Sequence, residues 1–460
     1  MIEAVGPSHV LTGAADMAPF LTDWRNRFTG RADAVALPAT TREAAAVVQA
    51  CSRHAASIVA QGGNTGLCGG ATPAPDGQSV VLSTRRMNRI LEIDPQNDTI
   101  TVQAGCTLQA VQDAAREAGR LFPLSLAAQG SCTIGGNLAT NAGGTQVLRY
   151  GNTRELTLGL EVVLADGRVW DGLRGLRKDN SGYDLKHAFI GSEGTLGVIT
   201  AATLKLFSTP RSRLTALAGL ESIEAAIALL QRMRSVAGPT LTAFELMSRD
   251  SLQPVAAVLG LRRFPFEPLT PWLVLLEISD HENEQHAFAL LEAALDPEAG
   301  APVVEVALGH SLAASEQLWR LRETIPEAQA RAGGNVKHDI SLPLARIRDF
   351  VQETGDRLAQ RFDWAQVLVF GHLGDGNLHY NVASRPGVPP QKVFEHEQAL
   401  NEIVYDAVAA RGGSLSAEHG LGQLKRDMAA RYKSPVELAL MRAIKFAVDP
   451  DGRMNPGKVL

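Results

Sequence analysis

The chain lacks three features that would assign it to common classes of protein. Its four cysteines, Cys51, Cys68, Cys106 and Cys132, show no Cys-x-x-Cys spacing, which argues against a zinc ribbon or a disulfide framework. No apolar run approaches the roughly 18 residues that span a membrane. The net charge of −5 leaves no basic footprint for nucleic acid. We therefore expect reduced cysteines that serve packing, and no nucleic-acid partner.

An export signal is also missing from the N-terminus. Residues 1–18 contain neither a basic n-region nor an apolar h-region. Together with the lack of an apolar span, this predicts a cytoplasmic protein, with peripheral attachment to a membrane partner left open. A length of 460 residues indicates about two to three domains, and a hydrophobic content of 45% is ample for a large core.

Glycine is abundant instead, and it is concentrated in particular loops. The 43 glycines exceed the usual share of about 7%. The first loop, residues 61–70, is Gln-Gly-Gly-Asn-Thr-Gly-Leu-Cys-Gly-Gly and follows a strand predicted at 57–60. Glycines at this density let backbone N–H groups approach an anion closely. The loop matches neither a Rossmann fingerprint nor a Walker loop. It indicates an anion-binding loop of another type or, alternatively, a surface turn.

Three further loops rich in small residues follow the first. They occupy residues 129–144, 178–185 and 191–200. A single loop of this kind would mean little. Four of them within about 140 residues predict one extended, phosphate-bearing ligand that is held largely by the backbone.

A second candidate site lies in residues 371–381, Gly-His-Leu-Gly-Asp-Gly-Asn-Leu-His-Tyr-Asn. Glycine and asparagine tolerate positive φ, so the middle of this stretch is predicted to form a hairpin turn. If Leu373 pairs with Leu378, then His372 lies opposite His379, with Cβ atoms about 4.5–5.5 Å apart. Two imidazoles so placed can share one metal ion, with metal–nitrogen bonds of about 2.0–2.1 Å. The alternative is a glycine-rich hairpin with two incidental histidines.

The stretch from Ser416 to Gly420 favours the metal, because it adds Glu418 and His419. Two histidines and one glutamate are a common ligand set for a catalytic divalent metal that keeps positions open for substrate. Zn²⁺ is the first expectation for this set, with Mn²⁺ or another divalent ion as the alternative. Taken alone, Glu418 is equally consistent with a surface carboxylate.

The pattern of predicted elements changes near residue 210. Before it, a capping box at Thr40 and Glu43 opens a helix that runs to His54. After it come two successive β-α-β units, which suggest a ferredoxin-like antiparallel sheet with helices on one face. Their strands and helices are expected at 214–220, 222–236 and 240–247, and at 271–279, 282–295 and 303–308.

The four loops, in this order, resemble the flavin domain of FAD enzymes of the vanillyl-alcohol-oxidase type. With the two histidines, Glu418 and the closing Asn-Pro-Gly-Lys at 455–458, the chain from about Ala32 resembles the FAD-linked D-2-hydroxy-acid dehydrogenases. It is most similar to those that act on D-2-hydroxyglutarate. The resemblance implies an α+β fold: a two-part FAD-binding domain of the vanillyl-alcohol-oxidase type and an α+β substrate (cap) domain with the ferredoxin-like sheet. The expected bounds are 1–210 for the FAD domain, 211–425 for the substrate domain with the metal site, and 426–460 for a segment returning to the FAD domain.

The resemblance implies FAD as the cofactor, bound without a covalent link. Some relatives attach the flavin through a histidine in the first loop, which carries no histidine here. The residues expected to hold FAD are Gly62, Gly63, Asn64, Thr65, Gly66, Gly130, Ser131, Gly135, Gly136, Asn137, Thr140, Asn141, Gly143, Gly144, Glu193, Gly197, Ile199 and Asn455.

Substrate-binding residues are also implied by the resemblance. The hydroxyglutarate enzymes use an Arg and a Lys, at the positions of Arg322 and Lys337, to hold a substrate carboxylate. An Arg fork suits carboxylate geometry, and a Lys adds a point charge. Taken alone, the helix and strand that carry these two residues would have solvated charges. Asn381 is expected to donate to a carboxylate. The chain departs from the animal enzymes at Pro326, where they carry a Thr that touches substrate.

The implied reaction oxidises the C2 alcohol of a D-2-hydroxy acid to a ketone. His372, His379 and Glu418 would hold the metal, His419 would act as general base, and the flavin would take the hydride. Two rival functions are a non-redox transferase similar to alkylglycerone-phosphate synthase and the flavin subunit of a glycolate-oxidase-like complex. D-lactate and D-malate are alternative substrates. The electron acceptor, an electron-transferring flavoprotein or a quinone, and the oligomeric state, with a homodimer as one option, are left open.

Overall fold

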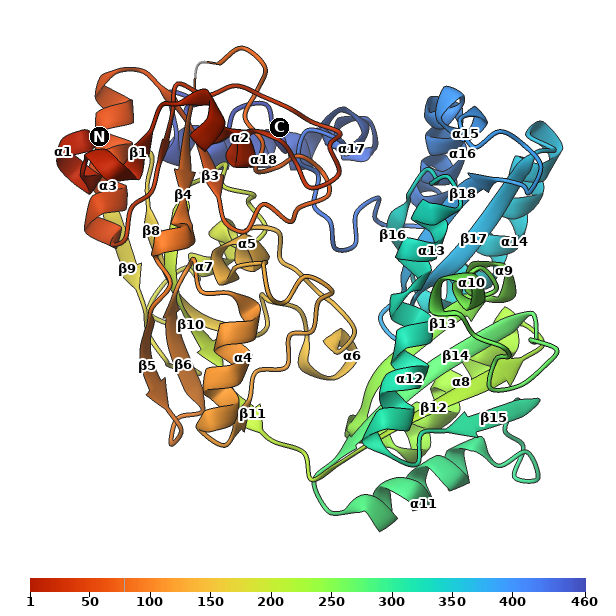
Figure 1. Ribbon diagram of the computed structural model, residues 1–460. Coiled ribbons are helices and arrows are strands. Elements are labelled where there is room, and N and C mark those ends of the chain that lie inside the picture. Colours follow the sequence, from red (N-terminus) through yellow and green to blue (C-terminus); the bar gives the residue numbers. More distant parts are fainter. Residues whose placement is uncertain (78) are drawn as a thin grey trace. The chain divides into compact units, whose positions relative to one another are not determined.

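The computed structural model describes residues 1–77 and 79–460 and divides them into two units (Figure 1). The first unit comprises Met1–Gly143, Gly151–Thr209 and Glu418–Leu460, and the second comprises Gly144–Tyr150 and Pro210–Ala417. The return to the first unit therefore begins at residue 418, earlier than the expected 426. Residues 144–150 belong to the second unit because α6 (Val147–Tyr150) packs against β13 (Leu241–Ser248).

A four-stranded sheet forms the N-terminal part of the first unit. Its order is β1 (Val10–Leu11), β2 (Ala34–Ala36), β4 (Ser79–Ser83) and β3 (Ser57–Gln61), and the last three strands are parallel. Helix α3 (Thr41–Arg53) begins at the expected capping box. The Thr40 hydroxyl accepts from the Glu43 N–H at 3.2 Å, while the Glu43 carboxylate accepts from the Ala39 N–H at 2.8 Å.

The C-terminal tail is attached to this same sheet. Met454 forms a parallel bridge with Ile58 on β3, where the Ile58 N–H donates to Arg453 O and the Asn455 N–H donates to Ile58 O. The Met454 side chain is fully buried in the core between α3 and the sheet. Helix α18 (Pro435–Val448) lies directly before this tail.

A five-stranded antiparallel sheet completes the first unit. Its order is β5 (Ile90–Asp94), β6 (Thr99–Gln103), β10 (Val198–Lys205), β8 (Thr157–Val163) and β9 (Val169–Gly172). Helix α5 (Ile134–Ala139), which lies in the second glycine-rich loop, packs against β10. Helix α4 (Leu108–Glu117) follows β6 in the chain.

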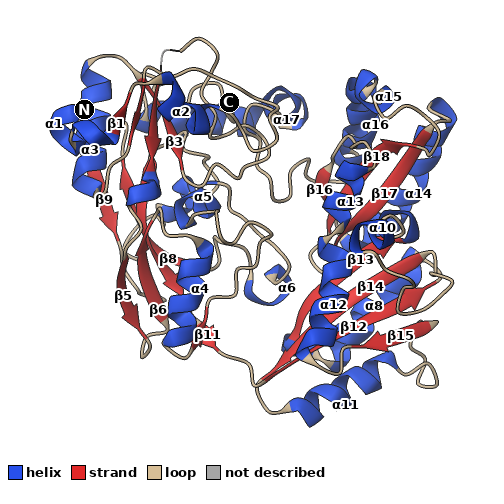
Figure 2. Ribbon diagram, viewed as in Figure 1, coloured by secondary structure: helices blue, strands red, loops and turns tan. Residues whose placement is uncertain are grey.

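The second unit is built on a seven-stranded antiparallel sheet, drawn red in Figure 2. The two predicted β-α-β units are β12 (Ser212–Leu220), α8 (Ile223–Val236) and β13, then β14 (Trp272–Asp280), α11 (Glu284–Leu295) and β15 (Glu305–Leu308). Their strand order, β15-β12-β14-β13, is the ferredoxin-like order, with α8 and α11 packed together on one face. The predicted fold class is therefore confirmed.

The histidine hairpin extends this sheet beyond the ferredoxin-like core. Strands β17 (Ala365–His372) and β18 (Asn377–Ser384) follow β13, and β16 (Asp339–Ser341) forms the edge. Helices α12 (Leu312–Glu323) and α13 (Ile325–Arg331) cover the face opposite α8, where Leu318 and Leu321 pack on Leu275. The core on this side is thus shared by the sheet and the helix that carries Arg322.

The predicted register of the hairpin is wrong by two residues. Phe370, not His372, pairs directly with His379, and the turn lies one residue earlier than expected. Because side chains alternate with a period of two, a shift of two leaves both histidines on the same face of the sheet. They become diagonal rather than opposed neighbours, with ring centroids 5.8 Å apart.

Among the described residues, no helix combines the length and the apolarity that crossing a membrane requires. The other α-helices and strands are α1 (Ile2–Val5), α2 (Ala14–Leu21), β7 (Arg120–Leu121), α7 (Lys186–Phe189), β11 (Phe207–Ser208), α9 (Arg249–Leu252), α10 (Val255–Leu259), α14 (Leu344–Arg361), α15 (Lys392–Glu395), α16 (Glu397–Ala409) and α17 (Arg426–Tyr432), and three short 3-10 helices lie at Pro7–His9, Thr84–Arg86 and Gly238–Thr240.

All four cysteines are buried, and none of them forms a disulfide bond in the described part of the chain. Burial raises the pKa of the Cys51 and Cys106 thiols to about 11, and it also raises the pKa of Cys132. A thiol with a pKa of about 11 is about one part in a thousand ionised at pH 8, and the thiolate is the reactive form.

We therefore expect the folded protein to react slowly with Ellman's reagent at pH 8, and all four thiols to react at once in denaturant. The release of thionitrobenzoate, followed by absorbance, measures both rates. Fast stoichiometric labelling of Cys51 or Cys106 in the folded protein would contradict the burial seen here.

Candidate cofactor and metal sites

A cavity in the first unit is walled by three of the four glycine-rich loops. It encloses about 920 Å³ of open space, including solvent at its mouth. Gly130 and Ser131 line an adjoining hollow that shares Gly63 and Thr133 with the cavity. The predicted cofactor residues that line the cavity itself are Gly62, Gly63, Asn64, Thr65, Gly66, Gly135, Gly136, Asn137, Thr140, Glu193, Gly197 and Ile199.

Four of the predicted cofactor residues lie outside these linings. They are Asn141, Gly143, Gly144 and Asn455, and Gly144 belongs to the second unit. The third loop, residues 178–185, is exposed along its whole length and contributes no lining residue in the described part of the chain.

Asn455 does not line the cavity but is hydrogen-bonded to two residues of its wall. It is buried, and its side-chain amide donates to Gly70 O at 2.8 Å and to Glu193 O at 2.7 Å. It thereby joins the first and fourth loops, which are 123 residues apart at these two contacts, through the C-terminal tail. The effect of Asn455 on a bound cofactor would be indirect.

The first two loops touch because Gly62 and Gly63 have no side chains. A Cβ atom at Gly63 would lie 1.9 Å from the carbonyl oxygen of Ser131, and one at Gly62 would lie 2.2 Å from the hydroxyl of Thr133. Any other residue at Gly63 must push the loops apart, because the obstacle is backbone. The shape of the cavity therefore depends on this contact.

The wall of the cavity carries buried polar atoms suited to a ligand. Within the described residues, the Gln61 side-chain oxygen and the Thr84 and Thr133 hydroxyls are buried without a hydrogen-bond partner. Buried polar groups in native proteins are normally paired, so these atoms fit a ligand with its own donors and acceptors. With Ala60 and Val198 as apolar wall, the cavity fits a flat cofactor with polar edges, as FAD is.

Glu193 turns its carboxylate toward the segment that carries His419. The carboxylate accepts from the backbone N–H groups of Leu421 at 2.7 Å and Gly422 at 2.8 Å. Burial raises the pKa of Glu193, and these two N–H donors oppose the rise. His419 also lines the cavity. Glu193, predicted as a cofactor residue, thus fixes the backbone beside the predicted general base.

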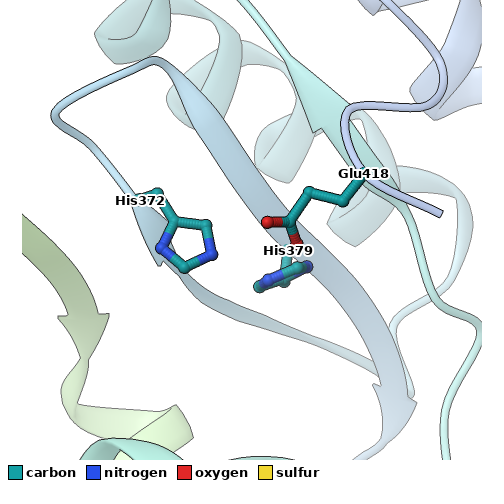
Figure 3. A group of neighbouring side chains, drawn as sticks. All are labelled: His372, His379 and Glu418. Carbon is teal, nitrogen blue, oxygen red and sulfur yellow. The ribbon is translucent and has the colours of Figure 1, made fainter. Parts of the chain in front are cut away.

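The predicted metal ligands converge, as Figure 3 shows. One ligand atom from each of His372, His379 and Glu418 lies within 4.8 Å of the other two. Glu418 directly follows Ala417, whose backbone N–H donates to Asp339 O on β16, so the preceding strand-like segment sets its position. Asp339 forms a second such group with Glu418 and His419. Two imidazoles and a carboxylate at this spacing fit a divalent transition metal.

His372 is oriented by a carboxylate that no sequence motif marks, that of Glu245. Glu245 on β13 lies directly opposite His372 on β17, and its Oε1 accepts from His372 Nδ1 at 2.6 Å. Burial alone would raise the pKa of Glu245, but the positive charges of His372 and Arg322 lower it. A histidine that donates from Nδ1 to a carboxylate presents Nε2 to a metal, the usual arrangement around metal ligands.

Arg322 binds the other oxygen of the same carboxylate. Its Nε donates to Glu245 Oε2 at 2.8 Å, and its guanidinium lies 4.8 Å from the centroid of the Phe370 ring. The Phe370 ring in turn lies 4.8 Å from that of His379. The structure therefore brings the predicted substrate arginine together with both predicted histidine ligands.

Lys337 and Asn381 face each other across two paired segments. The flanking pairs, Val336 with Val382 and Asp339 with His379, place Lys337 opposite Asn381. Lys337 is half-buried.

The Asn381 carboxamide already has protein partners. It donates to the Gln329 side-chain oxygen at 2.9 Å and accepts from the His338 N–H at 3.3 Å. Its expected contact with substrate remains a prediction. The two hydrogen bonds show that Asn381 also ties β18 to Gln329 and His338.

A second buried acid lies on the same face of the sheet. Glu277 on β14 accepts from the Trp319 indole at 3.0 Å, and burial raises its pKa. Trp319 and Arg322 lie one turn apart on α12, so two buried acids hold this helix on the sheet. Neither Glu245 nor Glu277 has a sequence motif, and the one available signal was a charged residue inside a predicted strand.

Comparisons with known proteins agree on one family. A model described as FAD binding domain matches residues 32–172, and one described as FAD linked oxidases, C-terminal domain, matches residues 209–459. A mitochondrial D-2-hydroxyglutarate dehydrogenase of Bos taurus is 41% identical over 465 residues, covering 100% of this chain and 82% of that protein.

Two further relatives cover nearly the whole chain. A D-2-hydroxyglutarate dehydrogenase of Xanthomonas citri pv. viticola is 40% identical over 458 residues, covering 99% of this chain and 95% of that protein. A mitochondrial protein of Schizosaccharomyces pombe, provisionally named a D-lactate dehydrogenase, is 39% identical over 459 residues, covering 97% of this chain and 85% of that protein.

Solved structures share the fold at low identity. p-Cresol methylhydroxylase with substrate bound has a TM-score of 0.78 at 17% identity, covering 100% of this chain and 95% of that one. An alkyldihydroxyacetonephosphate synthase has a TM-score of 0.72 at 18% identity, covering 98% and 82%. At such identities the likeness establishes the fold alone, so it does not support the transferase reaction for this chain.

The contact at Gly63 generates the first test of the cavity. We expect Gly63→Ala to lower FAD affinity about 5- to 150-fold, because overpacking costs about 1–3 kcal/mol and displaces a cavity wall. Fluorescence titration of the FAD-depleted protein with FAD measures this affinity. Gly182→Ala is the matched control, since its Cβ would meet nothing within 4 Å in an exposed loop. Equal FAD affinity in both variants would contradict the role of the loop contact.

Proposed function

Because the chain belongs to the FAD-linked oxidases, the family that its loops predicted, we propose that it oxidises a D-2-hydroxy acid to the 2-oxo acid with the help of a divalent metal. D-2-hydroxyglutarate is the first expected substrate. The observation that carries this proposal is the convergence of His372, His379 and Glu418 beside an arginine held by Glu245. The names of the relatives support the same substrate class.

Each residue of the proposed site has one task. His372, His379 and Glu418 would hold the metal, which when bound lowers the pKa of the substrate hydroxyl. His419 would accept the hydroxyl proton, since an imidazole titrates near neutral pH. Arg322 and Lys337 would bind the second carboxylate of the substrate, with Asn381 as a further donor.

The flavin is proposed to bind without a covalent bond. When bound, it would supply the redox chemistry of the reaction, as the acceptor for the hydride of C2. The cavity offers Asn64 and Cys68 in the first loop but no histidine there, and Glu193 and Asn455 hold its walls together. The electron acceptor would be an electron-transferring flavoprotein or a quinone.

Two observations support alternative substrates. Pro326 occupies the first turn of α13, so no hydroxyl is present at the position where the animal enzymes carry a Thr. One relative is provisionally named a D-lactate dehydrogenase. D-malate and D-lactate are therefore the competing substrates, and a flavin subunit of a larger complex would turn over poorly by itself. Dye-linked turnover of the purified chain with these acids tests the proposal.

The metal role predicts loss of turnover without loss of flavin. We expect His372→Ala, His379→Ala and Glu418→Ala each to lower kcat/KM more than about a hundredfold, because Lewis-acid stabilisation contributes several kcal/mol. Bound metal is measured by elemental analysis. FAD content is measured in the supernatant after denaturation, which also checks that the flavin is released.

His310→Ala is the matched control for the metal variants, because His310 is an exposed histidine of the same unit that stacks on Phe288. It should retain turnover, metal and FAD. Full activity of wild-type protein shown to be metal-free would exclude the metal role, and flavin that stays with the precipitate would exclude non-covalent binding.

Substrate choice depends on the second carboxylate. Charge-assisted hydrogen bonds contribute about 1.5–3 kcal/mol each, which corresponds to about a ten- to hundredfold preference per contact. A monocarboxylate leaves Arg322 and Lys337 without this partner. We expect kcat/KM of the wild type to be higher for D-2-hydroxyglutarate than for D-lactate. In Lys337→Ala, we expect kcat/KM to fall about ten- to hundredfold more for D-2-hydroxyglutarate than for D-lactate.

Lys392→Ala is the matched control, because Lys392 is another half-buried lysine of the same unit and lies over Trp364. Lys392→Ala should leave the ratio of kcat/KM for D-2-hydroxyglutarate to kcat/KM for D-lactate at its wild-type value. Steady-state kinetics with both acids decides the matter: a wild type that prefers lactate, or a Lys337→Ala loss that is equal on both acids, would show that these cations do not bind the second carboxylate.

A further inference from the structure

Glu245 joins two proposed functions through one side chain. Its Oε1 accepts from Nδ1 of His372 at 2.6 Å, and its Oε2 accepts from Nε of Arg322 at 2.8 Å. Its side chain is 0% exposed. The two partners come from different elements, β17 and α12, so each carboxylate oxygen has a separate task.

The geometry of the sheet explains why a glutamate can serve both partners. Glu245 and His372 are a directly opposed pair across β13 and β17, which sets their side chains about 4.5–5.5 Å apart at Cβ. Arg322 reaches the same face from α12. The hydrogen bond from Trp319 to Glu277 holds α12 on the sheet. A carboxylate has two oxygens and so can accept from both sides at once.

We propose that Glu245 is a positioning residue that couples the metal site to recognition of the second carboxylate. The inference rests on the proposed function, since it assigns a partner to one metal ligand and to one substrate-binding residue. By accepting from Nδ1, Glu245 directs Nε2 of His372 to the metal. By accepting from Nε, it directs the remaining N–H groups of Arg322 to the substrate.

One substitution should therefore disturb both functions. A glutamine at this position has one acceptor oxygen and one NH₂ group, so it can satisfy His372 or Arg322 but must face the other with a donor. Glu245→Gln keeps the volume of the side chain and removes the double acceptor. Loss of such an outer partner typically weakens metal affinity or activity about 10- to 100-fold.

The first measurement is Zn²⁺ affinity. Wild type and Glu245→Gln, each with FAD bound and stripped of metal by chelator, are titrated with Zn²⁺ against a chromophoric zinc chelator. We expect the variant to bind Zn²⁺ about 10- to 100-fold more weakly. This readout needs no turnover. If the wild type itself binds no Zn²⁺, Mn²⁺ or other divalent ion, the metal part of the proposed function fails; if both bind equally, only the coupling fails.

The second measurement is the preference for the dicarboxylate. The ratio of kcat/KM for D-2-hydroxyglutarate to that for D-lactate should fall at least about tenfold in Glu245→Gln, mainly through KM for the dicarboxylate. A variant that loses metal affinity but keeps the wild-type ratio would refute the link between the two sites. A wild type that has no dicarboxylate preference would instead refute the proposed substrate.

Glu277→Gln is the matched control. Glu277 is a buried glutamate on the neighbouring strand and the same sheet face, but its carboxylate accepts instead from Trp319, Thr215 and Thr242 and forms a long ion pair with Arg213 at 3.8 Å. Glutamine keeps a side-chain oxygen that can accept from the Trp319 indole, so α12 should stay on the sheet in this variant. Glu277→Gln should therefore change Zn²⁺ affinity and the substrate ratio less than about threefold. An equal effect from both variants would mean that any buried acid on this face matters for folding alone, and it would overturn the proposal.

Glu245→Asp keeps the measurement decisive if Glu245→Gln does not fold. Aspartate retains both oxygens and the charge but is one methylene shorter, so it can reach the two partners only with longer hydrogen bonds. It should lose Zn²⁺ affinity and dicarboxylate preference in the same direction as glutamine and by a smaller factor. Wild-type values for both quantities in Glu245→Asp would overturn the proposal.

Discussion

A buried carboxylate must be compensated by charge and by donors, because an isolated charge in an apolar interior is too costly. Glu245 meets this requirement with His372 on β17 and Arg322 on α12. These two partners determine which elements lie next to Glu245: β13 must pair with β17, and α12 must lie on the face of the sheet to which Glu245 points. Glu277 and Trp319 repeat the device one helical turn earlier. The functional face of the second unit therefore follows from placing two acids in the interior of a sheet.

The first unit achieves order by a different means. Its cavity is formed by backbone and small side chains, and the critical contact is the approach of Gly63 to the Ser131 carbonyl. Few charges are involved, apart from Glu193, which accepts from two backbone N–H groups of the segment that follows His419. Backbone donors keep their positions whatever the side chains do, so such a wall is suited to holding a cofactor in place. The proposed metal ligands, in contrast, are side chains, and the orientation of His372 is set by another side chain, that of Glu245.

Local patterns in the sequence predicted the two β-α-β units and the glycine-rich loops, three of which wall the cavity, while the individual cofactor residues were implied by the family resemblance. The two β-α-β units were found because each strand and helix has its own periodicity, and the glycine-rich loops because their composition is unusual. The register of the hairpin was not found, because Leu373 and Leu378 suggest a symmetric turn while the pairing of Phe370 with His379 depends on β13 and β16 as well. Glu245 was missed for a related reason. Its partners lie 77 and 127 residues away, and nothing in the strand pattern distinguishes it from a solvent-facing acid.

Stability alone does not account for the group formed by Glu245, His372 and Arg322. Replacing a buried ion pair by well-packed apolar residues is often neutral or stabilising by about 1–4 kcal/mol, whereas removing one partner costs about 3–5 kcal/mol. An apolar set would therefore serve the fold at least as well. The three polar residues are also constrained together, because replacing any one of them would leave another buried polar group without its partner. Under the proposed function, His372 would hold a metal and Arg322 a substrate carboxylate, and this constraint would then make metal binding and substrate choice change together.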